Sequence, residues 1–387
     1  MNSPLWDDGK WTPRAPLEGT QRADVCVVGL GGSGLAALDE LAARGVSAIG
    51  VDAGPVGGGA AGRNGGFVLT GLARFYHDTR IQLGPRLAAA LHQATVTEVV
   101  RQAEEFPELV HLGGSLRIAA DAEELEDCRR HRAALEADGF PVAWYKGAEG
   151  EGLLLPGDGA MQPLARVRAL ATKVRAKAVR WYEHSPVRRV LPGQVVTAGG
   201  VVACDTVIVA VDGRLEAVLP EVAGLVRTAR LQMLATAPAP EVRFPRPVYY
   251  RHGFEYWQQR PDGTVALGGF RDHALETEWT HATEPTDFVQ GRLENFLRGH
   301  LRVRAPVTHR WAASVGYTPD GLPVLAEVHP KVWAVGGYNG TGNIVGALCA
   351  RAAAQRACAA AAPWADLMDE ATRVVRRGGT AAARAGG

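Results

Sequence analysis

Features that would mark several other classes of protein are scarce in this 387-residue sequence. It contains five cysteines without a Cys-x-x-Cys pair, so no disulfide framework is expected and reduced, buried thiols are the default. Its eleven histidines are scattered without metal-ligand spacing, and we expect no metal site. With a net charge of only +1, the chain has no strongly basic surface for nucleic acid or an acidic membrane.

Long apolar runs are also missing. No stretch of about eighteen apolar residues would span a membrane, and the first residues do not resemble a signal peptide. Together with the reduced thiols, this predicts a cytoplasmic protein with neither a membrane nor a nucleic-acid partner. The sequence has no Gly-x-Ser-x-Gly elbow and no Gly-Lys-Thr phosphate loop. Its length and 47% hydrophobic content predict a large core divided between two domains.

A dinucleotide-binding pattern is present near the N-terminus. Residues 25–28 read Val-Cys-Val-Val and predict a buried strand, which Gly29, Gly31 and Gly34 follow. Glycines at this spacing permit a tight turn, a close approach of the backbone to a pyrophosphate, and close packing of the next helix on the strand. The phosphates would then lie at the positive N-terminus of that helix. A second short strand ends at Asp52, whose carboxylate would accept hydrogen bonds from the adenosine ribose.

Three further segments carry a resemblance to a known family. Residues 57–66 end in Arg-Asn-Gly-Gly, and this run resembles the second signature of the glycine oxidase, sarcosine oxidase and γ-glutamylputrescine oxidase group of the D-amino-acid-oxidase superfamily. The lead-in, residues 6–24, is similar to that of the γ-glutamylputrescine oxidase branch, and residues 311–343 resemble the family's C-terminal flavin motif. The chain departs from the pattern at Asp52, where the family has Glu, at Asp39 and at Gly50.

The resemblance implies an α/β fold, α+β overall. We expect a discontinuous Rossmann-like FAD-binding domain, residues 1–84, 164–229 and 306–375, with an inserted substrate domain, residues 85–163 and 230–305, built on an antiparallel sheet. The tail, residues 376–387, has no pattern that could bury side chains and is expected to be disordered.

The resemblance also implies that FAD is the cofactor. No cysteine precedes Thr318 in the C-terminal motif and His77 has no supporting motif, so we expect the FAD to be non-covalent. Backbone N–H groups at a glycine-rich helix N-terminus would lie beside the flavin N1–C2=O edge, where negative charge develops on reduction. The expected FAD-binding residues are Gly29, Gly31, Gly32, Ser33, Gly34, Asp52, Ala53, Gly59, Ala60, Arg63, Asn64, Gly65, Gly66, Val187, Ala210, Gly213, Gly337, Gly340, Thr341 and Gly342.

Alternating strands between residues 230 and 304 predict the antiparallel sheet, and Arg-Pro-Asp-Gly at 260–263 predicts a hairpin turn within it. In the family this sheet covers the substrate face of the flavin. For any one aromatic residue the alternative is a place in the sheet core, and for Arg271 the alternative is a surface ion pair. The candidates for the substrate pocket are Tyr256, Trp257, Phe270, Arg271, His273, Tyr317 and Tyr338.

The function expected from the resemblance is oxidation of the C–N bond of a small-molecule amine by hydride transfer to flavin N5, with oxygen or another electron acceptor reoxidising the flavin. No catalytic acid or base is named. Val315 and Ile344 occupy the positions at which amino-acid-oxidising relatives hold an α-carboxylate with a cation, so an amine without that group is favoured. Ala266 stands where some relatives place a Lys above the flavin. The alternatives are an α-amino-acid oxidase of the glycine or sarcosine type and an FAD-holding subunit without turnover.

Overall fold

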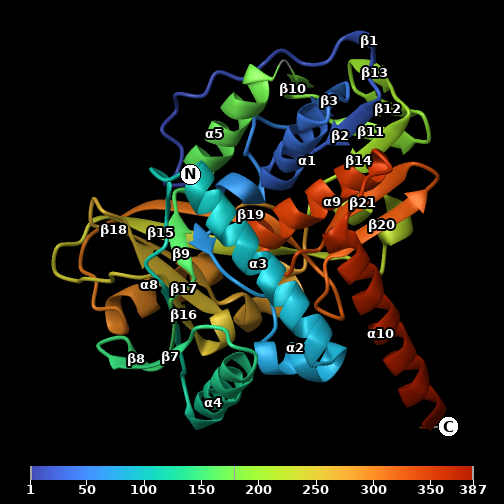
Figure 1. Ribbon diagram of the computed structural model, residues 1–387. Coiled ribbons are helices and arrows are strands. Elements are labelled where there is room, and N and C mark those ends of the chain that lie inside the picture. Colours follow the sequence, from blue (N-terminus) through green and yellow to red (C-terminus); the bar gives the residue numbers. More distant parts are fainter. Residues whose placement is uncertain (1, 178, 386–387) are drawn as a thin grey trace.

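The computed structural model describes residues 2–177 and 179–385. Two large sheets lie side by side with helices packed around them (Figure 1). The first sheet has six strands in the order β10 (Arg180–Tyr182), β3 (Ala48–Val51), β2 (Val25–Val28), β14 (Thr206–Val209), β21 (Val332–Gly336) and β20 (Val324–His329). All neighbours are parallel except β20 and β21. This confirms the expected Rossmann-like half.

Helices cover one face of this sheet and strands between residues 194 and 203 cover the other, which explains the continuous apolar sequences of its central strands. Every residue of β2, β3 and β14 is buried, as expected where both faces of a parallel sheet are covered. Leucines of α1 share one core cluster with residues of the other helices that pack there. These helices are α1 (Gly32–Ala43), α5 (Pro163–Ala176), α9 (Ala347–Ala357) and α3 (Pro85–Glu105).

The second sheet has eight strands in the order β19 (Val307–Tyr317), β15 (Arg227–Pro238), β18 (Thr264–Gly269), β17 (Glu255–Gln259), β16 (Val248–Tyr250), β6 (Ser115–Ile118), β8 (Gly150–Leu155) and β7 (Ala143–Gly147). It is antiparallel except where β6 meets β16. The predicted hairpin joins β17 to β18. Helix α8 (Asp287–Gly299) packs on one face, and the other face is turned toward the six-stranded sheet. Strand β19, which was expected in the FAD-binding domain, pairs along its length with β15 of this sheet.

Two smaller sheets complete the strands of the described chain. A four-stranded sheet has the order β1 (Gly19–Arg22), β13 (Gly200–Ala203), β12 (Gln194–Thr197) and β11 (Val187–Leu191). A three-stranded sheet has the order β4 (Phe67–Val68), β9 (Gly159–Met161) and β5 (Val110–His111). Two further helices, α2 (Tyr76–Leu83) and α4 (Ala122–Ala137), lie below α3 in Figure 1. Asp121 caps α4 by accepting from Glu124 N at 2.9 Å.

The C-terminal segment differs from the expectation of disorder. Helix α10 (Pro363–Ala385) continues through residues 376–385 and extends away from the rest of the molecule (Figure 1). Its first turns are held by Trp364, Ala365 and Met368 in the core. The helix then propagates through an alanine-rich sequence, which needs no burial to favour helical backbone. Residues 386–387 lie outside the described part of the chain.

Two other expectations are tested by the fold. Cys26, Cys128, Cys204 and Cys349 are buried and Cys358 is partly buried, all as free thiols. Among the described helices, none is long and apolar enough to cross a membrane.

Candidate active site

The turn between β2 and α1 is shaped by backbone contacts. Gly29 has φ +106°, a conformation that favours glycine. A Cβ atom on Gly34 would collide with the carbonyl oxygen of Gly29, so α1 approaches β2 this closely only because residue 34 has no side chain. The N-terminus of α1 is thereby held above the end of the central strand. Such a helix end attracts phosphate.

Asp52, at the end of β3, is tied to the same turn. Its Oδ2 accepts from Leu30 N at 2.6 Å, and its Oδ1 accepts from Gly54 N at 2.8 Å. Burial raises the pKa of Asp52, and the two N–H groups oppose that rise. Each carboxylate oxygen keeps a second lone pair. Asp52 therefore organises the turn and can still accept hydrogen bonds from a ribose.

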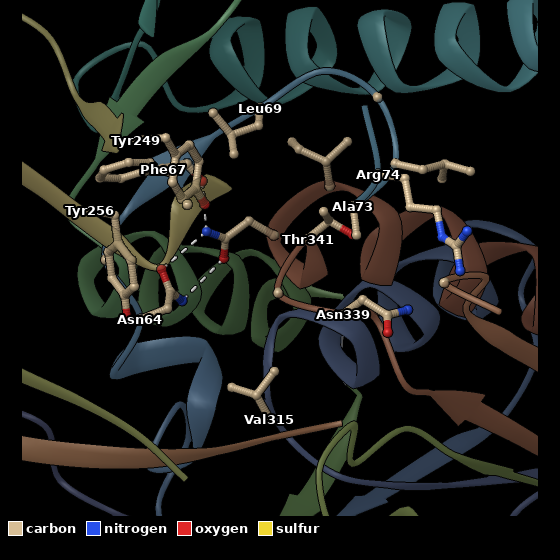
Figure 2. A pocket seen from close by; sticks show the side chains of 18 of the residues that line it. Asn64, Phe67, Leu69, Ala73, Arg74, Tyr249, Tyr256, Val315, Asn339 and Thr341 are labelled. Atoms are coloured by element: carbon tan, nitrogen blue, oxygen red, sulfur yellow. Dashed lines mark hydrogen bonds between the residues drawn. The ribbon is translucent and has the colours of Figure 1, made fainter. Parts of the chain in front are cut away.

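Asn64 joins the Arg-Asn-Gly-Gly run at residues 63–66 to the glycine-rich motif near the C-terminus. Its Oδ1 accepts from Gly66 N at 2.8 Å and from Asn343 Nδ2 at 3.1 Å. Asn343 Nδ2 also donates to Phe67 O at 2.8 Å, as the dashed lines in Figure 2 show in part. Asn343 was not predicted as a site residue. Its position next to Gly342 in the glycine-rich motif was the available signal.

Arg63 is held by hydrogen bonds to strand β19 of the eight-stranded sheet. Its Nε donates to Ala312 O at 2.7 Å and its Nη2 to Asn2 O at 3.1 Å, while Trp311 Nε1 donates to Arg63 O at 2.7 Å. Burial lowers the pKa of Arg63, and Glu284 and Asp7 oppose this effect. The arginine of the Arg-Asn-Gly-Gly run therefore holds strand β19 and the N-terminal segment against the cofactor half.

Asp212 stands at the crossing between the two halves, directly after β14. It adopts φ +53°, and its carboxylate accepts from Tyr338 N at 3.0 Å and Gly316 N at 3.3 Å. Burial raises the pKa of Asp212 to about 6, against the opposing effect of these N–H groups. The carboxylate thus joins β19 of the eight-stranded sheet to the segments that follow β14 and β21 in the six-stranded sheet.

A cavity of about 720 Å³ lies between these segments and the inner face of the eight-stranded sheet. This volume falls within the range of small-molecule sites. Figure 2 shows Asn64, Thr341 and Asn339 around it, with Tyr249 and Tyr256 on the sheet side. Of the predicted cofactor residues, those that line it are Ala60, Arg63, Asn64, Gly65, Gly340 and Thr341.

The remaining predicted cofactor residues lie outside the cavity lining. One group surrounds the turn before α1 and the end of β3: Gly29, Gly31, Gly32, Ser33, Gly34, Asp52, Ala53 and Gly59. Gly66 lies apart from this group, beside Met161 and the side chain of Gln258. Others flank Asp212 and the end of β21: Ala210, Gly213, Gly337 and Gly342. Val187 begins β11 of the four-stranded sheet.

The pocket candidates separate according to the pleat of the sheet. Tyr256, Arg271 and Tyr317 line the cavity. Trp257 follows Tyr256 in the same strand and therefore points to the opposite face, where it is 1% exposed in the core beneath α8. Phe270 packs against Phe296 in that core. The structure thus places Trp257 and Phe270 away from the cavity.

Two more candidates also lie outside the cavity lining. His273 Nε2 lies 3.7 Å from Asp272 Oδ2 on a short turn after β18. Tyr338 is buried, with its ring against the glycines of the π-helical turn Gly342–Gly346. The C-terminal motif brings Tyr338 close to the cofactor segments along the chain, but its ring points into the fold.

One row of residues crosses the sheet beside the cavity, and its first three members, Arg117, Tyr249 and Tyr256, line it. Arg117, Tyr249, Tyr256 and Gly268 are successive partners on β6, β16, β17 and β18. Gly268 has no side chain, and a Cβ there would collide with the ring of Tyr256. Arg117 was not predicted as a site residue. Its polar side chain, two residues after Ser115 on the same face of β6, was a weak signal, because the face of the sheet to which it belongs depends on the pairing of β6 with β16.

Four arginines line the cavity, and none of them has a carboxylate partner within ion-pair distance in the described residues: Arg63, Arg74, Arg117 and Arg271. Arg63 and Arg74 donate to backbone carbonyl oxygens instead. Arg117 lies over the ring of Phe75 at 4.5 Å, and its Nε is buried without an acceptor. Arg271 lies 4.6 Å from the ring centroid of Tyr317, and its Nη1 is likewise buried without an acceptor. Neither belongs to an ion pair within 4 Å in the parts of the chain that are described.

Two neutral histidines and a buried carboxyl group line the end of the cavity near Arg117. Burial lowers the pKa of His92 to about 4 and that of His131 well below its usual range. His131 Nδ1 accepts from Tyr76 N at 2.8 Å. Asp158 accepts from Thr70 N and Thr70 Oγ1, both at 2.8 Å, and burial raises its pKa.

The three positions compared with relatives are also placed. Val315 and Ile344 are both apolar and both among the residues that line the cavity. Figure 2 shows the side chain of Val315 there. Ala266 is not among the lining residues. It lies on the same face of β18 as Gly268, two residues along the strand, and packs there in a cluster with Trp6, Trp311 and Met233.

Comparisons with known proteins agree with this geometry. The profile of the DAO family, described as FAD dependent oxidoreductase, matches residues 24–356. The chain belongs to this family of FAD-dependent oxidoreductases. It is therefore an FAD-dependent oxidoreductase of a family that acts on the C–N bonds of amines and amino acids.

Individual relatives are distant. The chain is 26% identical over 377 residues to a probable oxidoreductase OrdL of Rhizobium meliloti, which covers 88% of this chain and 84% of the relative. It is 24% identical over 364 residues to the γ-glutamylputrescine oxidoreductase of Escherichia coli, and this match covers 86% of this chain and 83% of the relative. The fold is similar to glycine oxidase from Geobacillus kaustophilus, with a TM-score of 0.74, 22% identity and coverage of 88% and 96%. The fold is also similar to an L-amino acid deaminase from Proteus vulgaris, with a TM-score of 0.72 and 17% identity. That match covers 91% of this chain and 94% of the deaminase chain.

The residues of this chain fit FAD. The glycine turn and the N-terminus of α1 suit a pyrophosphate, Asp52 suits a ribose, and Gly340 and Thr341 suit the flavin at the cavity. The sheet face then lies across the cavity from the cofactor segments.

Proposed function

We propose that this oxidoreductase oxidises a long amine that has no carboxylate on the reacting carbon and carries a carboxylate at its far end. The observation that carries the proposal is the distribution of charge on the cavity wall. Val315 and Ile344 are apolar, whereas Arg117 and Arg271 lack a carboxylate partner among the described residues. A carboxylate in a dry pocket requires a cation.

The spacing of the sheet favours a long substrate. Arg117 and Tyr256, which both line the cavity, are separated by two strand spacings in the register of β6, β16 and β17. At roughly 4.8 Å each, this is about 10 Å along the cavity wall. An amine that reacts near the cofactor segments and reaches Arg117 must be extended.

Bound FAD supplies the acceptor for the hydride that leaves the amine-bearing carbon. The protein side chains have the tasks of orientation and exclusion of water. Burial raises the pKa of Tyr249 and Tyr256, so both hydroxyls stay protonated. Burial also keeps His92 neutral above pH of about 4. We therefore assign no strong base, and the substrate reacts as the neutral amine.

The relative from Escherichia coli supports the same substrate class. γ-Glutamylputrescine, the compound in its name, is an amine with a carboxylate remote from the reacting end. At 24% identity, we propose the class of substrate for this chain and leave the individual compound to experiment.

An anaerobic titration tests the proposal. γ-Glutamylputrescine, the analogue without its carboxylate, glycine, sarcosine and D-alanine are added separately while flavin absorbance is followed. We expect bleaching by γ-glutamylputrescine, weaker apparent affinity for the analogue, and little reduction by the amino acids. Reduction by glycine or D-alanine at least as fast as by every amine would replace the proposal with an α-amino-acid oxidase, and a flavin that no compound reduces would favour a subunit without turnover.

Two variants connect the result to the cavity. Arg117→Met and Arg271→Met are compared with Arg292→Met, which changes an exposed arginine on α8. If either cavity arginine holds the remote carboxylate, its variant raises KM for γ-glutamylputrescine and leaves KM for the carboxylate-free analogue unchanged. Equal effects on both compounds would contradict that assignment.

Reoxidation and attachment of the cofactor are separate parts of the proposal. We propose oxygen as the electron acceptor and non-covalent FAD. Stopped-flow mixing of reduced enzyme with air-saturated buffer measures the first, and a half-time of minutes would make the protein a dehydrogenase. Acid precipitation measures the second, because non-covalent FAD is released intact whereas tethered flavin stays with the polypeptide.

A further inference from the structure

Arg166, on α5, is a buried cation that the substrate chemistry does not use. Arg166 is only 2% exposed, and no described residue forms a hydrogen bond or an ion pair with its guanidinium group. Its Nε is fully enclosed without an acceptor. Burial lowers the pKa of this guanidinium to about 10, which leaves it charged at neutral pH. An unpaired buried charge is costly, so this arrangement requires an explanation.

The guanidinium lies at the start of α1. Its Nη1 is 3.1 Å from the position that a Cβ on Gly32 would occupy, and Gly32 is the first residue of α1. A side chain at position 32 would therefore press on the guanidinium. Because the N-terminus of α1 is the positive end of the helix dipole, Arg166 adds a second positive charge to the same place.

The nearby carboxylates are already engaged with other cations. Glu98 pairs with Arg101, at 3.1 Å, and with Arg351. Glu105 pairs with Arg101, at 3.0 Å, and with Lys173. These groups act on Arg166 through space, the two glutamates favouring its charge and the two arginines opposing it. None lies within ion-pair distance of Arg166 in the described chain.

We propose that Arg166 is a ligand of the FAD pyrophosphate and that Gly32 leaves the space for its guanidinium. The diphosphate carries negative charge to a place where a helix terminus and a buried arginine otherwise leave positive charge uncompensated. Arginine suits this role because its planar group can donate two hydrogen bonds to phosphate oxygens.

This assignment has two consequences of opposite sign. In the apoprotein Arg166 is unpaired, so Arg166→Met removes an uncompensated charge and raises the melting temperature. In the holoprotein Arg166 is paired, so the same variant weakens FAD binding by about 10- to 100-fold, the range for a hydrogen bond to a charged group. A residue that only packs between α5 and α1 would lower the stability of the apoprotein and leave FAD affinity unchanged.

The experiment compares apoproteins of the wild type, Arg166→Met and Arg175→Met, the last of which removes an exposed charge from the same helix. FAD affinity is measured by recovery of flavin fluorescence quenching, and stability by thermal unfolding without FAD. We expect weaker FAD binding and a higher apoprotein melting temperature for Arg166→Met only. Unchanged FAD affinity, or an equal change in Arg175→Met, overturns the proposal.

A second measurement compares the wild-type apoprotein with Arg166→Lys, and its wild-type part stands even if Arg166→Met does not fold. Inorganic pyrophosphate is expected to raise the melting temperature more than chloride at the same ionic strength, and Arg166→Lys is expected to reduce that rise. A pyrophosphate effect equal to that of chloride contradicts the proposal. No amine is present in either experiment, so the outcome is independent of the proposed substrate.

Discussion

The site has two sides, the cofactor segments around the turn before α1 and the eight-stranded sheet that faces the amine. On the cofactor side a backbone carbonyl oxygen limits the space for side chains, whereas on the amine side an aromatic ring does. Residue 34 must be glycine because the backbone of Gly29 occupies the place of its Cβ, and residue 268 must be glycine because the ring of Tyr256 occupies that place. Backbone cannot move without disturbing a whole strand, but a ring can rotate. The cofactor side is therefore the more rigidly specified half, and the amine side has more freedom to change its ligand.

The largest expected effect is on the cofactor side. Gly34→Ala forces α1 away from β2, and we expect a loss of about 3 kcal/mol or more of unfolding free energy together with loss of FAD. Denaturant unfolding and the flavin content of the purified protein measure the two. The control is Gly291→Ala in α8, where nothing lies within 4 Å of the added Cβ and stability should rise by roughly 0.5–1 kcal/mol. A yellow Gly34→Ala protein of normal stability would break the comparison.

A smaller effect is expected for the ribose contact. Asp52→Ala removes a charged acceptor and leaves Leu30 N and Gly54 N without their partner, so FAD binding should weaken by about 1.5–3 kcal/mol. Calorimetric titration of the apoprotein with FAD measures the change. Asp52→Glu keeps the carboxylate and should recover part of the affinity. Equal affinities for Asp52→Ala and the wild type would show that Asp52 only supports the fold.

On the amine side, Gly268→Ala should act on the substrate alone. The added methyl group displaces the ring of Tyr256, and we expect kcat/KM for the amine to fall about tenfold, equivalent to about 1.4 kcal/mol, with FAD affinity unchanged. Adding Tyr256→Leu to Gly268→Ala removes the ring and should relieve the collision. Loss of FAD from Gly268→Ala would mean that the two halves are coupled more tightly than the comparison implies.

The smallest effect concerns Asp212, which joins the halves. Its pKa in the folded protein, about 6, lies above the ordinary value of 3.8, so the folded state binds the proton more tightly than the unfolded state. This contribution to stability is present below pH of about 4 and is lost as pH rises through 6. Asp212→Asn should match the wild type near pH 4 and exceed it near pH 7 by on the order of 1 kcal/mol. Denaturant unfolding at both pH values measures the difference in unfolding free energy between Asp212→Asn and the wild type. If that difference is the same at pH 4 and pH 7, protonation of Asp212 does not contribute to stability.

Local sequence was sufficient for most of the cofactor half. The apolar run before Gly29, the glycine spacing through Gly34 and the acid at Asp52 act within one βαβ unit, so their geometry follows from contacts between neighbours in the chain. The hairpin of β17 and β18 was predictable for the same reason, because its turn residues are adjacent. The tail was predicted wrongly, since α10 propagates from a packed start that the final residues alone do not reveal.

Tertiary structure alone decided the amine half. Tyr256 and Trp257 are neighbours of similar chemistry, and the sheet pleat sends one to the cavity and the other to the core beneath α8. Arg117 reaches the same wall only because β6 pairs with β16, a segment more than a hundred residues away in the chain. Arg166 faces Gly32 because α5 packs against α1. Contacts between distant segments depend on register and packing, and these are set by the whole core rather than by any local pattern.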